Sequence, residues 1–352
     1  MFWKTRLNTN MKMLIGFTVL LLASAAWSQE MPYAEYLEQI QACPKECRCL
    51  PSFPNAVYCD SKGLKQIPTI PPYTWYLYLQ NNLIDAISEK SFKNATQLRW
   101  VNLNRNKITN KGIDKNVFKA MTQLLYLYIE DNLLDEVPSP LPTSLEQLRL
   151  SRNKISKIPA GVFNSMENLA MLDLQNNKLE DAAIKENTFK GLKNLIQINL
   201  SKNKLKIMPP GLPATIMQLF LDSNSIDKIP DNYFKETPKV SFLRLNYNKL
   251  ADGGLPKNIF NISTILDLQL SHNQLNHVPH FHPSLEHLHL DHNKITRVNG
   301  SDICPMPVGA TDDYHDEKTP RLRYLRLDGN EINPPIPMDL MMCFRLLRAV
   351  VI

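Results

Sequence analysis

Apolar and polar residues follow one short pattern that recurs eleven times along the chain. The clearest copy runs from Leu145 to Ile155, with apolar residues at positions 1, 4, 6 and 11 and an asparagine at position 9. In an extended segment, positions 4 and 6 point to one side and positions 3, 5 and 7 to the other. Every copy is therefore predicted to form a short strand with one apolar face. The asparagines of the copies are Asn82, Asn106, Asn132, Asn153, Asn177, Asn203, Asn224, Asn248, Asn273, Asn293 and Asn330.

No single copy buries its apolar face alone, but stacked copies join their strands into a parallel sheet over a continuous core. The spacing is the signature of leucine-rich repeats. A buried amide without partners costs about 1 to 3 kcal/mol, so each asparagine should bond the backbone of its own and the adjacent turn. The predicted fold is an α/β repeat solenoid, a horseshoe with a concave parallel sheet and an irregular, polyproline or short-helix convex side.

The copies also differ in length, in a regular order. Successive asparagines are 24, 26, 21, 24, 26, 21, 24, 25, 20 and 37 residues apart, so a short unit follows two long ones. The short units carry proline-rich stretches at 138–142, 209–213 and 279–283, which should run extended and thin. The long units place a phenylalanine before the next strand, which predicts an aromatic spine under the convex side, formed by Phe92, Phe118, Phe163, Phe189, Phe234 and Phe260.

The amino-terminal segment is typical of a secreted protein. Three basic residues precede an apolar run over 13–26, and small residues follow. This order predicts a signal peptide over 1–28. A membrane anchor is the competing interpretation, but about 14 apolar residues fall short of the roughly 20 that a spanning helix needs. We expect secretion without a membrane anchor.

An acidic, tyrosine-containing tail follows over 29–42. It is too short and polar to fold alone. Tyr33 and Tyr36 stand beside acidic residues and are predicted sites of tyrosine sulfation, the alternative being an unmodified solvated tail.

All cysteines lie at the two ends of the repeat array. A solenoid needs terminal caps, and disulfides stabilise small caps in oxidising compartments. We expect a cysteine-rich cap over 43–73, repeats 1–10 over 74–295, and an extended penultimate repeat with a disulfide cap over 296–352. Four clustered cysteines permit three pairings, and zinc is the rival interpretation. The cysteines are Cys43, Cys47, Cys49, Cys59, Cys304 and Cys343.

Charge and motifs exclude several classes of function. The chain has 40 basic and 34 acidic residues; without the three basic residues of the signal, 37 minus 34 leaves +3. This small charge is not the concentrated basic face of a nucleic-acid-binding protein. Motifs of serine hydrolases, zinc proteases, phosphate loops and dinucleotide sites are absent from the sequence. We expect neither an enzyme nor a cofactor.

The outward positions of the strands predict a ligand face on the concave side. Exposed aromatic side chains beside arginines have no core role there and suit a protein partner. The alternative is that the rings pack on one another along the sheet and only smooth it. A face-to-face homodimer would cover the same surface. The predicted face comprises Tyr76, Tyr78, Trp100, Tyr126, Tyr128, Arg149, Asp173, Phe220, Asp222, Phe242 and Arg244.

Three further groups of polar residues are candidate sites. Acceptors for N-glycosylation occur at Asn94, Asn199, Asn261 and Asn299. Asn199 occupies position 5 of its strand, so its glycan would stand on the concave face. The lysines that follow six of the asparagines should line one rim, as a solvated edge or an attraction for sulfated polymers. His287 and His289 lie on the sheet face but lack a carboxylate to complete a metal shell, so no metal site is predicted.

The cysteine spacing C-x3-C-x-C-x9-C, the long-long-short rhythm and the stretched penultimate repeat between two cysteines resemble the class II small leucine-rich proteoglycans. The similarity covers 43–352, and the stretches 75–82, 95–100 and 325–332 most resemble a keratan sulfate-bearing member from cornea. The resemblance implies disulfides Cys43–Cys49, Cys47–Cys59 and Cys304–Cys343. It also implies covalently attached keratan sulfate or N-glycans on some acceptors, although Asn168 lacks the acceptor motif expected in this family.

The resemblance implies a function as well. The chain would be an extracellular-matrix keratan sulfate proteoglycan core that binds fibrillar collagen and regulates fibril diameter and spacing, as in corneal stroma. The alternative is a soluble leucine-rich repeat recognition protein that binds a growth factor or another protein ligand on its concave face.

Overall fold

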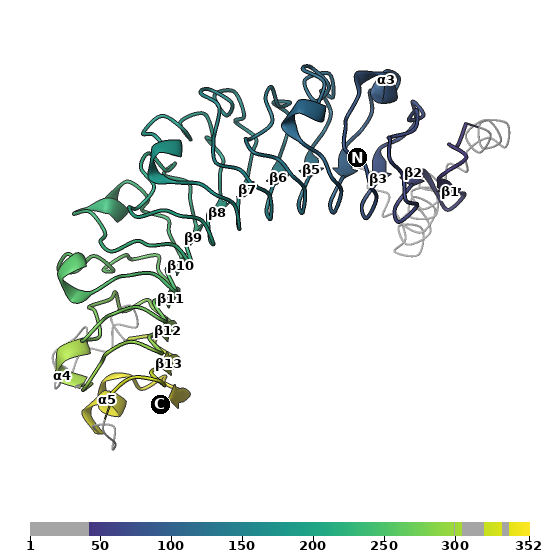
Figure 1. The fold of residues 1–352 in the computed structure, drawn as a ribbon. Helices are drawn as coiled ribbons and strands as arrows, with labels where there is room; N and C mark the ends of the chain where they lie inside the picture. The colour runs from purple at the N-terminus through teal and green to yellow at the C-terminus, as the bar shows by residue number, and fades with distance from the viewer. Residues whose placement is uncertain (1–41, 299, 305–319, 333–337) are drawn as a thin grey trace, which may run out of the picture.

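The computed structural model describes residues 42–298, 300–304, 320–332 and 338–352. The chain forms an arc, and its strands line the inner side in sequence order (Figure 1). They form one sheet in which β1 pairs antiparallel with β2 and all later neighbours pair parallel. The strands are β1 Arg48–Leu50, β2 Phe53–Tyr58, β3 Tyr76–Tyr78, β4 Trp100–Asn102, β5 Tyr126–Tyr128, β6 Gln147–Arg149, β7 Met171–Asp173, β8 Gln197–Asn199, β9 Gln218–Phe220, β10 Phe242–Arg244, β11 Asp267–Gln269, β12 His287–His289, β13 Tyr324–Arg326 and β14 Ala349–Val351.

The register of the sheet places the central residue of each strand in one buried row. Leu148 pairs with Leu172, and Leu172 pairs with Ile198 in the next repeat. All three side chains are fully buried. The flanking residues of these strands are half-buried and face the concave side. The predicted solenoid of leucine-rich repeats is confirmed.

The asparagine column joins neighbouring repeats through their backbones. The Nδ2 atom of Asn153 donates to the Leu150 carbonyl of its own turn at 3.0 Å and to the Ile129 carbonyl of the preceding repeat at 2.7 Å. Its Oδ1 atom accepts from the Leu134 amide at 3.1 Å. These backbone groups lie past the ends of the short strands and cannot pair within the sheet. The buried asparagine amide forms hydrogen bonds with them instead. The predicted role of the asparagines is confirmed.

Short helices lie on the outer side of the arc, as α3 shows in Figure 1. They are α3 Glu89–Phe92, η1 Asn110–Gly112, η2 Asp181–Ala183, η3 Tyr233–Lys235, η4 Asp252–Gly254, α4 Gly300–Ile303 and α5 Met338–Cys343. The six spine phenylalanines are buried. Phe163 contacts Phe189 at a centroid distance of 6.1 Å, and Phe234 contacts Phe260 at 6.3 Å. The aromatic spine thus contains ring pairs within consecutive long units.

The proline-rich stretches of the short units contain no helix, as expected from the fixed proline backbone. The stretch 279–283 instead forms one parallel bridge, between Phe281 and Phe260 of the preceding long unit.

Both ends of the array are capped. Disulfides join Cys43 to Cys49, Cys47 to Cys59 and Cys304 to Cys343, the pairs that the resemblance implied. Strand β14 closes the sheet within the predicted terminal segment. The predicted signal peptide, most of the tyrosine-containing tail and residues 305–319 of the extended penultimate repeat lie outside the described residues. Within the described ranges, no helix is long and apolar enough to cross a membrane.

Candidate functional site

A row of aromatic rings crosses the amino-terminal part of the concave sheet. Tyr58 stacks on Tyr78 at a centroid distance of 4.6 Å, and Tyr78 and Trp100 make an edge contact at 4.5 Å. Trp100 meets Tyr128 at 5.6 Å, and the Arg149 guanidinium lies 4.7 Å from the Tyr128 ring centre. We call these five residues the aromatic ladder. It extends over β2 to β6, so five adjacent strands each contribute one side chain.

The ladder combines direct and diagonal contacts between neighbouring strands. Tyr58 pairs directly with Tyr78, and Tyr128 with Arg149. Tyr76 pairs directly with Trp100, whereas Tyr78 pairs with Asn102, so the contact between Tyr78 and Trp100 is diagonal. Large rings reach across such diagonals in sheets. Each ladder residue is half-buried, because it contacts its neighbours while part of its surface remains exposed. The rings therefore pack on one another, as one interpretation predicted, and still present a continuous aromatic surface.

Hydrogen bonds fix two of the tyrosines on this part of the sheet. The Tyr128 hydroxyl donates to Gln147 Oε1 at 3.1 Å, and the Tyr126 hydroxyl donates to Glu146 Oε2 at 3.0 Å. The bond to the Glu146 carboxylate raises the pKa of Tyr126, and burial raises the pKa of Tyr78. Both phenols are neutral donors at physiological pH.

Charged residues follow the ladder toward the middle of the arc. The Asp173 carboxylate accepts from the Gln175 amide at 2.9 Å, and burial raises its pKa despite the nearby arginines. The Nε atom of Arg149 is buried and makes no hydrogen bond to another described residue. The side chain as a whole is half-buried and lies over the Tyr128 ring at the end of the ladder.

A second, smaller cluster lies on β9 and β10. Arg244 forms an ion pair with the buried Asp222 at 2.7 Å, and its guanidinium lies 5.3 Å from the ring centre of Phe220. Burial raises the pKa of Asp222, although Arg244 opposes this shift. Phe242 stands beside the cluster with 37% of its surface exposed. Strands β7 and β8 separate this cluster from the ladder (Figure 1).

The structure thus gathers the predicted concave residues into two groups. It brings Tyr78, Trp100, Tyr128 and Arg149 together, with Tyr76 and Tyr126 on the same strands. Sequence reasoning missed Tyr58, because β2 belongs to the cap and lacks the repeat pattern. The available signal was an apolar residue followed by a tyrosine, Val57 and Tyr58, which matches Leu77 and Tyr78 of the first repeat.

The histidines form a different arrangement from the one considered in the sequence. His289 packs on Tyr324 at 5.1 Å, whereas His272 and His292 stack at 4.1 Å with Tyr247 beyond them. Donor atoms of His272, Asp291 and His292 lie within 4.8 Å of one another. An imidazole binds a metal in its ring plane, and these two planes are nearly parallel. We therefore assign the stack a packing role.

The glycosylation acceptors occupy two kinds of surface. Asn94 and Asn261 are exposed on the convex turns. Asn199 is half-buried in β8, where its Nδ2 atom donates to Gln175 and its Oδ1 atom accepts from the Ser201 amide at 3.1 Å. Asn299 lies outside the described residues, as do Tyr33 and Tyr36.

The predicted rim of lysines is exposed throughout. One of them, Lys204, forms an ion pair with Glu180 at 3.1 Å. The row comprises Lys107, Lys154, Lys178, Lys204, Lys249 and Lys294.

Family models match most of the array. The model described as leucine rich repeat matches residues 75–137 and 143–205, and a second leucine rich repeat model matches 284–306. The leucine rich repeat N-terminal domain matches 42–71, the region of the amino-terminal cap.

Solved structures show the same fold. A chain from the octameric complex of latrophilin 3, Unc5D and FLRT2 matches with a TM-score of 0.66 at 22% identity, over 88% of this chain and 83% of that one. An internalin from Listeria monocytogenes matches with a TM-score of 0.58 at 18% identity, over 84% of this chain and 86% of that one. At such identities the likeness concerns the fold alone.

Curated relatives cover nearly the whole chain. Keratocan of Danio rerio is 65% identical over 99% of this chain and 100% of its own length. Keratocan of Homo sapiens is 64% identical over 88% of each chain, and human prolargin is 56% identical over 88% of this chain and 81% of its own. These comparisons confirm the predicted resemblance. The chain therefore belongs to the small leucine-rich repeat proteoglycans of the extracellular matrix, the family of keratocan and prolargin.

Proposed function

We propose that this chain is a keratan sulfate proteoglycan core that binds fibrillar collagen through the aromatic ladder. The observation that carries the proposal is the continuous contact of Tyr58, Tyr78, Trp100 and Tyr128 on the concave sheet. Exposed aromatic side chains are expensive to leave in water, and they dominate the energetics of protein interfaces.

The chemistry of the ladder suits a collagen triple helix. Collagen consists of three polyproline-like chains, whose rings are apolar and whose carbonyl groups point outward. Aromatic-lined surfaces recognise polyproline helices in other protein modules. At the ladder, proline rings would pack on the tyrosine and tryptophan edges. The half-buried Arg149 guanidinium, at the end of the ladder, would donate to a collagen carbonyl.

The sulfated chains would act away from this face. Asn94 and Asn261 lie on the outer turns, so polymers attached there would extend from the convex side. Their negative charge and bound water would keep neighbouring fibrils apart. The core would limit the lateral growth of a fibril, and the chains would set the spacing.

A turbidity assay of collagen fibril formation, with fibril diameters measured by electron microscopy, tests this function. The secreted chain should co-sediment with the fibrils and yield thinner ones. Digestion with keratanase should leave binding intact and reduce fibril spacing. Fibrils of unchanged diameter and no co-sedimentation would refute the collagen-binding part.

A homodimer through the concave sheet would cover the ladder. Sedimentation velocity with and without a soluble collagen triple-helical peptide separates the two arrangements. We expect collagen peptide to compete with any such dimer, because both use the same rings.

A further inference from the structure

Two pockets on the convex side of the array are bordered by glycosylation acceptors. The first has a volume of about 540 Å³ and lies between the turn that carries α3 and the turn of the next repeat. The second has a volume of about 460 Å³ and lies between the turns at 231–238 and 256–263. Each pocket therefore lies between two consecutive long repeats, the pair that precedes a short repeat.

The acceptor motifs themselves contribute to the pocket walls. Asn261, Ile262 and Ser263 form a complete acceptor motif, and all three line the second pocket. In the first pocket, Ala95 and Thr96 of the Asn94 motif line the wall. Both asparagines stand four residues before the first apolar position of the next strand, since 98 minus 94 and 265 minus 261 both equal 4.

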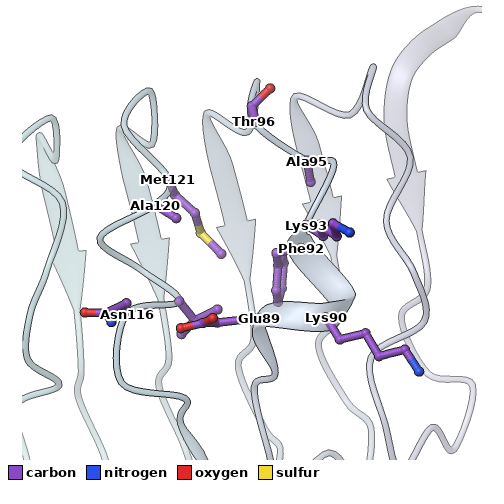
Figure 2. A pocket seen from close by; sticks show the side chains of 10 residues that line it. Glu89, Lys90, Phe92, Lys93, Ala95, Thr96, Asn116, Ala120 and Met121 are labelled. Atoms are coloured by element: carbon purple, nitrogen blue, oxygen red, sulfur yellow. The ribbon is translucent and has the colours of Figure 1, made fainter.

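The lining combines an apolar floor with a polar rim. Figure 2 shows Phe92 and Met121 extending into the space between the two turns, with Glu89 and Asn116 at its base. In the second pocket, Phe234 and Ile262 form apolar parts of the floor, and Asp231 and Lys235 are exposed at the rim. A pyranose ring needs this combination, because its C–H faces are apolar and its hydroxyl groups form hydrogen bonds.

We propose that each pocket seats the first N-acetylglucosamine units of the glycan attached to its own acceptor, Asn94 or Asn261. This inference rests on the proposed use of these acceptors for N-linked chains. A glycan tethered at the pocket edge has a high effective concentration there, so weak contacts suffice to hold it. The seated stem would direct the remaining polymer away from the concave face.

Asn199 differs from these two acceptors. Its side chain lies in β8 and is hydrogen-bonded to neighbouring groups of the sheet. A glycan at Asn199 would stand on the concave surface with no turn on either side to hold it. Seated stems are therefore expected at Asn94 and Asn261 and not at Asn199.

The test uses the full chain, secreted from cells in which glycan maturation stops at the high-mannose stage, so that endoglycosidase H can trim each glycan to a single N-acetylglucosamine. Glycopeptide mass analysis first establishes which acceptors are modified. Hydrogen exchange of 256–263 is then compared between this protein and the Ser263→Ala variant, which keeps Asn261 but loses the glycan. The amides of Ile259 and Asn261 bond the carbonyls of Pro256 and Asn258 in this turn. The single sugar should slow their exchange by about threefold or more, because it stabilises the turn against local opening.

A matched pair of wall variants shows whether the pocket is responsible. Asp231→Ala with Lys235→Ala removes one acidic and one basic residue from the pocket rim. Glu236→Ala with Lys239→Ala removes the same charges from exposed positions of the same turn that do not line the pocket. The first pair should abolish the protection given by the sugar, and the second should retain it.

Each outcome decides a separate claim. An unmodified Asn261 would overturn both the use of this acceptor and the seated stem. A modified Asn261 whose sugar leaves exchange unchanged, or protects it equally in both double variants, would overturn the seated stem alone. Protection lost only in the rim variant supports the proposal.

Discussion

At the scale of single residues, the asparagine column explains why the repeat holds its shape. Each amide serves carbonyl and N–H groups of two turns at once, as Asn153 does for its own repeat and the preceding one. The sequence predicts this role fully, because a buried polar residue at a fixed position must find partners in the backbone. The outward residues are different, since nothing in the repeat pattern specifies them.

Replacing Asn153 by alanine should lower the free energy of unfolding by about 2 to 4 kcal/mol, because buried carbonyl and N–H groups lose their partners. Urea denaturation followed by circular dichroism measures the change. Lys154→Ala, at the next and exposed position, is the control and should change it by less than about 0.5 kcal/mol. Equal losses in both variants would contradict the role of the amide.

His289 should make stability depend on pH. Burial lowers its pKa from the ordinary value of 6.5, although Asp267 and Asp291 favour the charged form. As pH falls below 6.5, the unfolded chain takes up the proton first, so the folded state loses stability until pH passes the lowered pKa. Stability is fully present above this window.

Urea unfolding at several pH values between 7.5 and 5.5 should therefore show a declining free energy of unfolding. His289→Gln should reduce the slope of the decline. An identical slope in the variant would show that other groups cause it.

At the scale of elements, the convex turns depend on close contact between repeats. Gly254 ends η4, and its carbonyl accepts from the Ile229 amide of the preceding repeat at 2.9 Å. A Cβ atom at Gly254 would lie 2.1 Å from the Asp227 carbonyl oxygen, whereas one at the adjacent Gly253 would meet nothing within 4 Å.

Gly254→Ala should destabilise the protein by about 2 kcal/mol, because the added carbon forces two repeats apart. Gly253→Ala is the control and should leave the melting temperature unchanged or slightly raised. Differential scanning calorimetry of both variants checks this. A tolerated Gly254→Ala would mean that the turns are not in fixed contact.

Sequence patterns could predict these elements only in part. Strands such as β6 follow from the apolar residues at positions 4 and 6, and proline excludes helices from the short units. The ladder could not be predicted as a unit, because Tyr78 and Trp100 meet across a diagonal and Tyr58 comes from the cap. The convex pockets depend on the distance between adjacent turns, and no residue pattern in the sequence predicts this distance.

At the scale of the whole molecule, the arc separates two surfaces. The strands line the inside of the arc, and the turns lie on its outside (Figure 1). The sheet carries the aromatic ladder, and the turns carry the acceptors Asn94 and Asn261. A disulfide stabilises the cap at each end of the array, so both ends of the apolar core are covered. This separation is what a protein needs if it binds one fibril and holds others away.

The most direct test is the affinity of the purified chain for reconstituted collagen fibrils, measured by co-sedimentation for the wild type and for Trp100→Ala with Tyr128→Ala. Loss of two central rings should weaken binding by about 30-fold or more, since two such residues, whose contributions are not additive, together contribute at least about 2 kcal/mol. Ile207→Ala, at an exposed apolar residue outside the strands, should bind as the wild type does. If the double variant melts normally and binds fibrils with undiminished affinity, the aromatic ladder is not the collagen site.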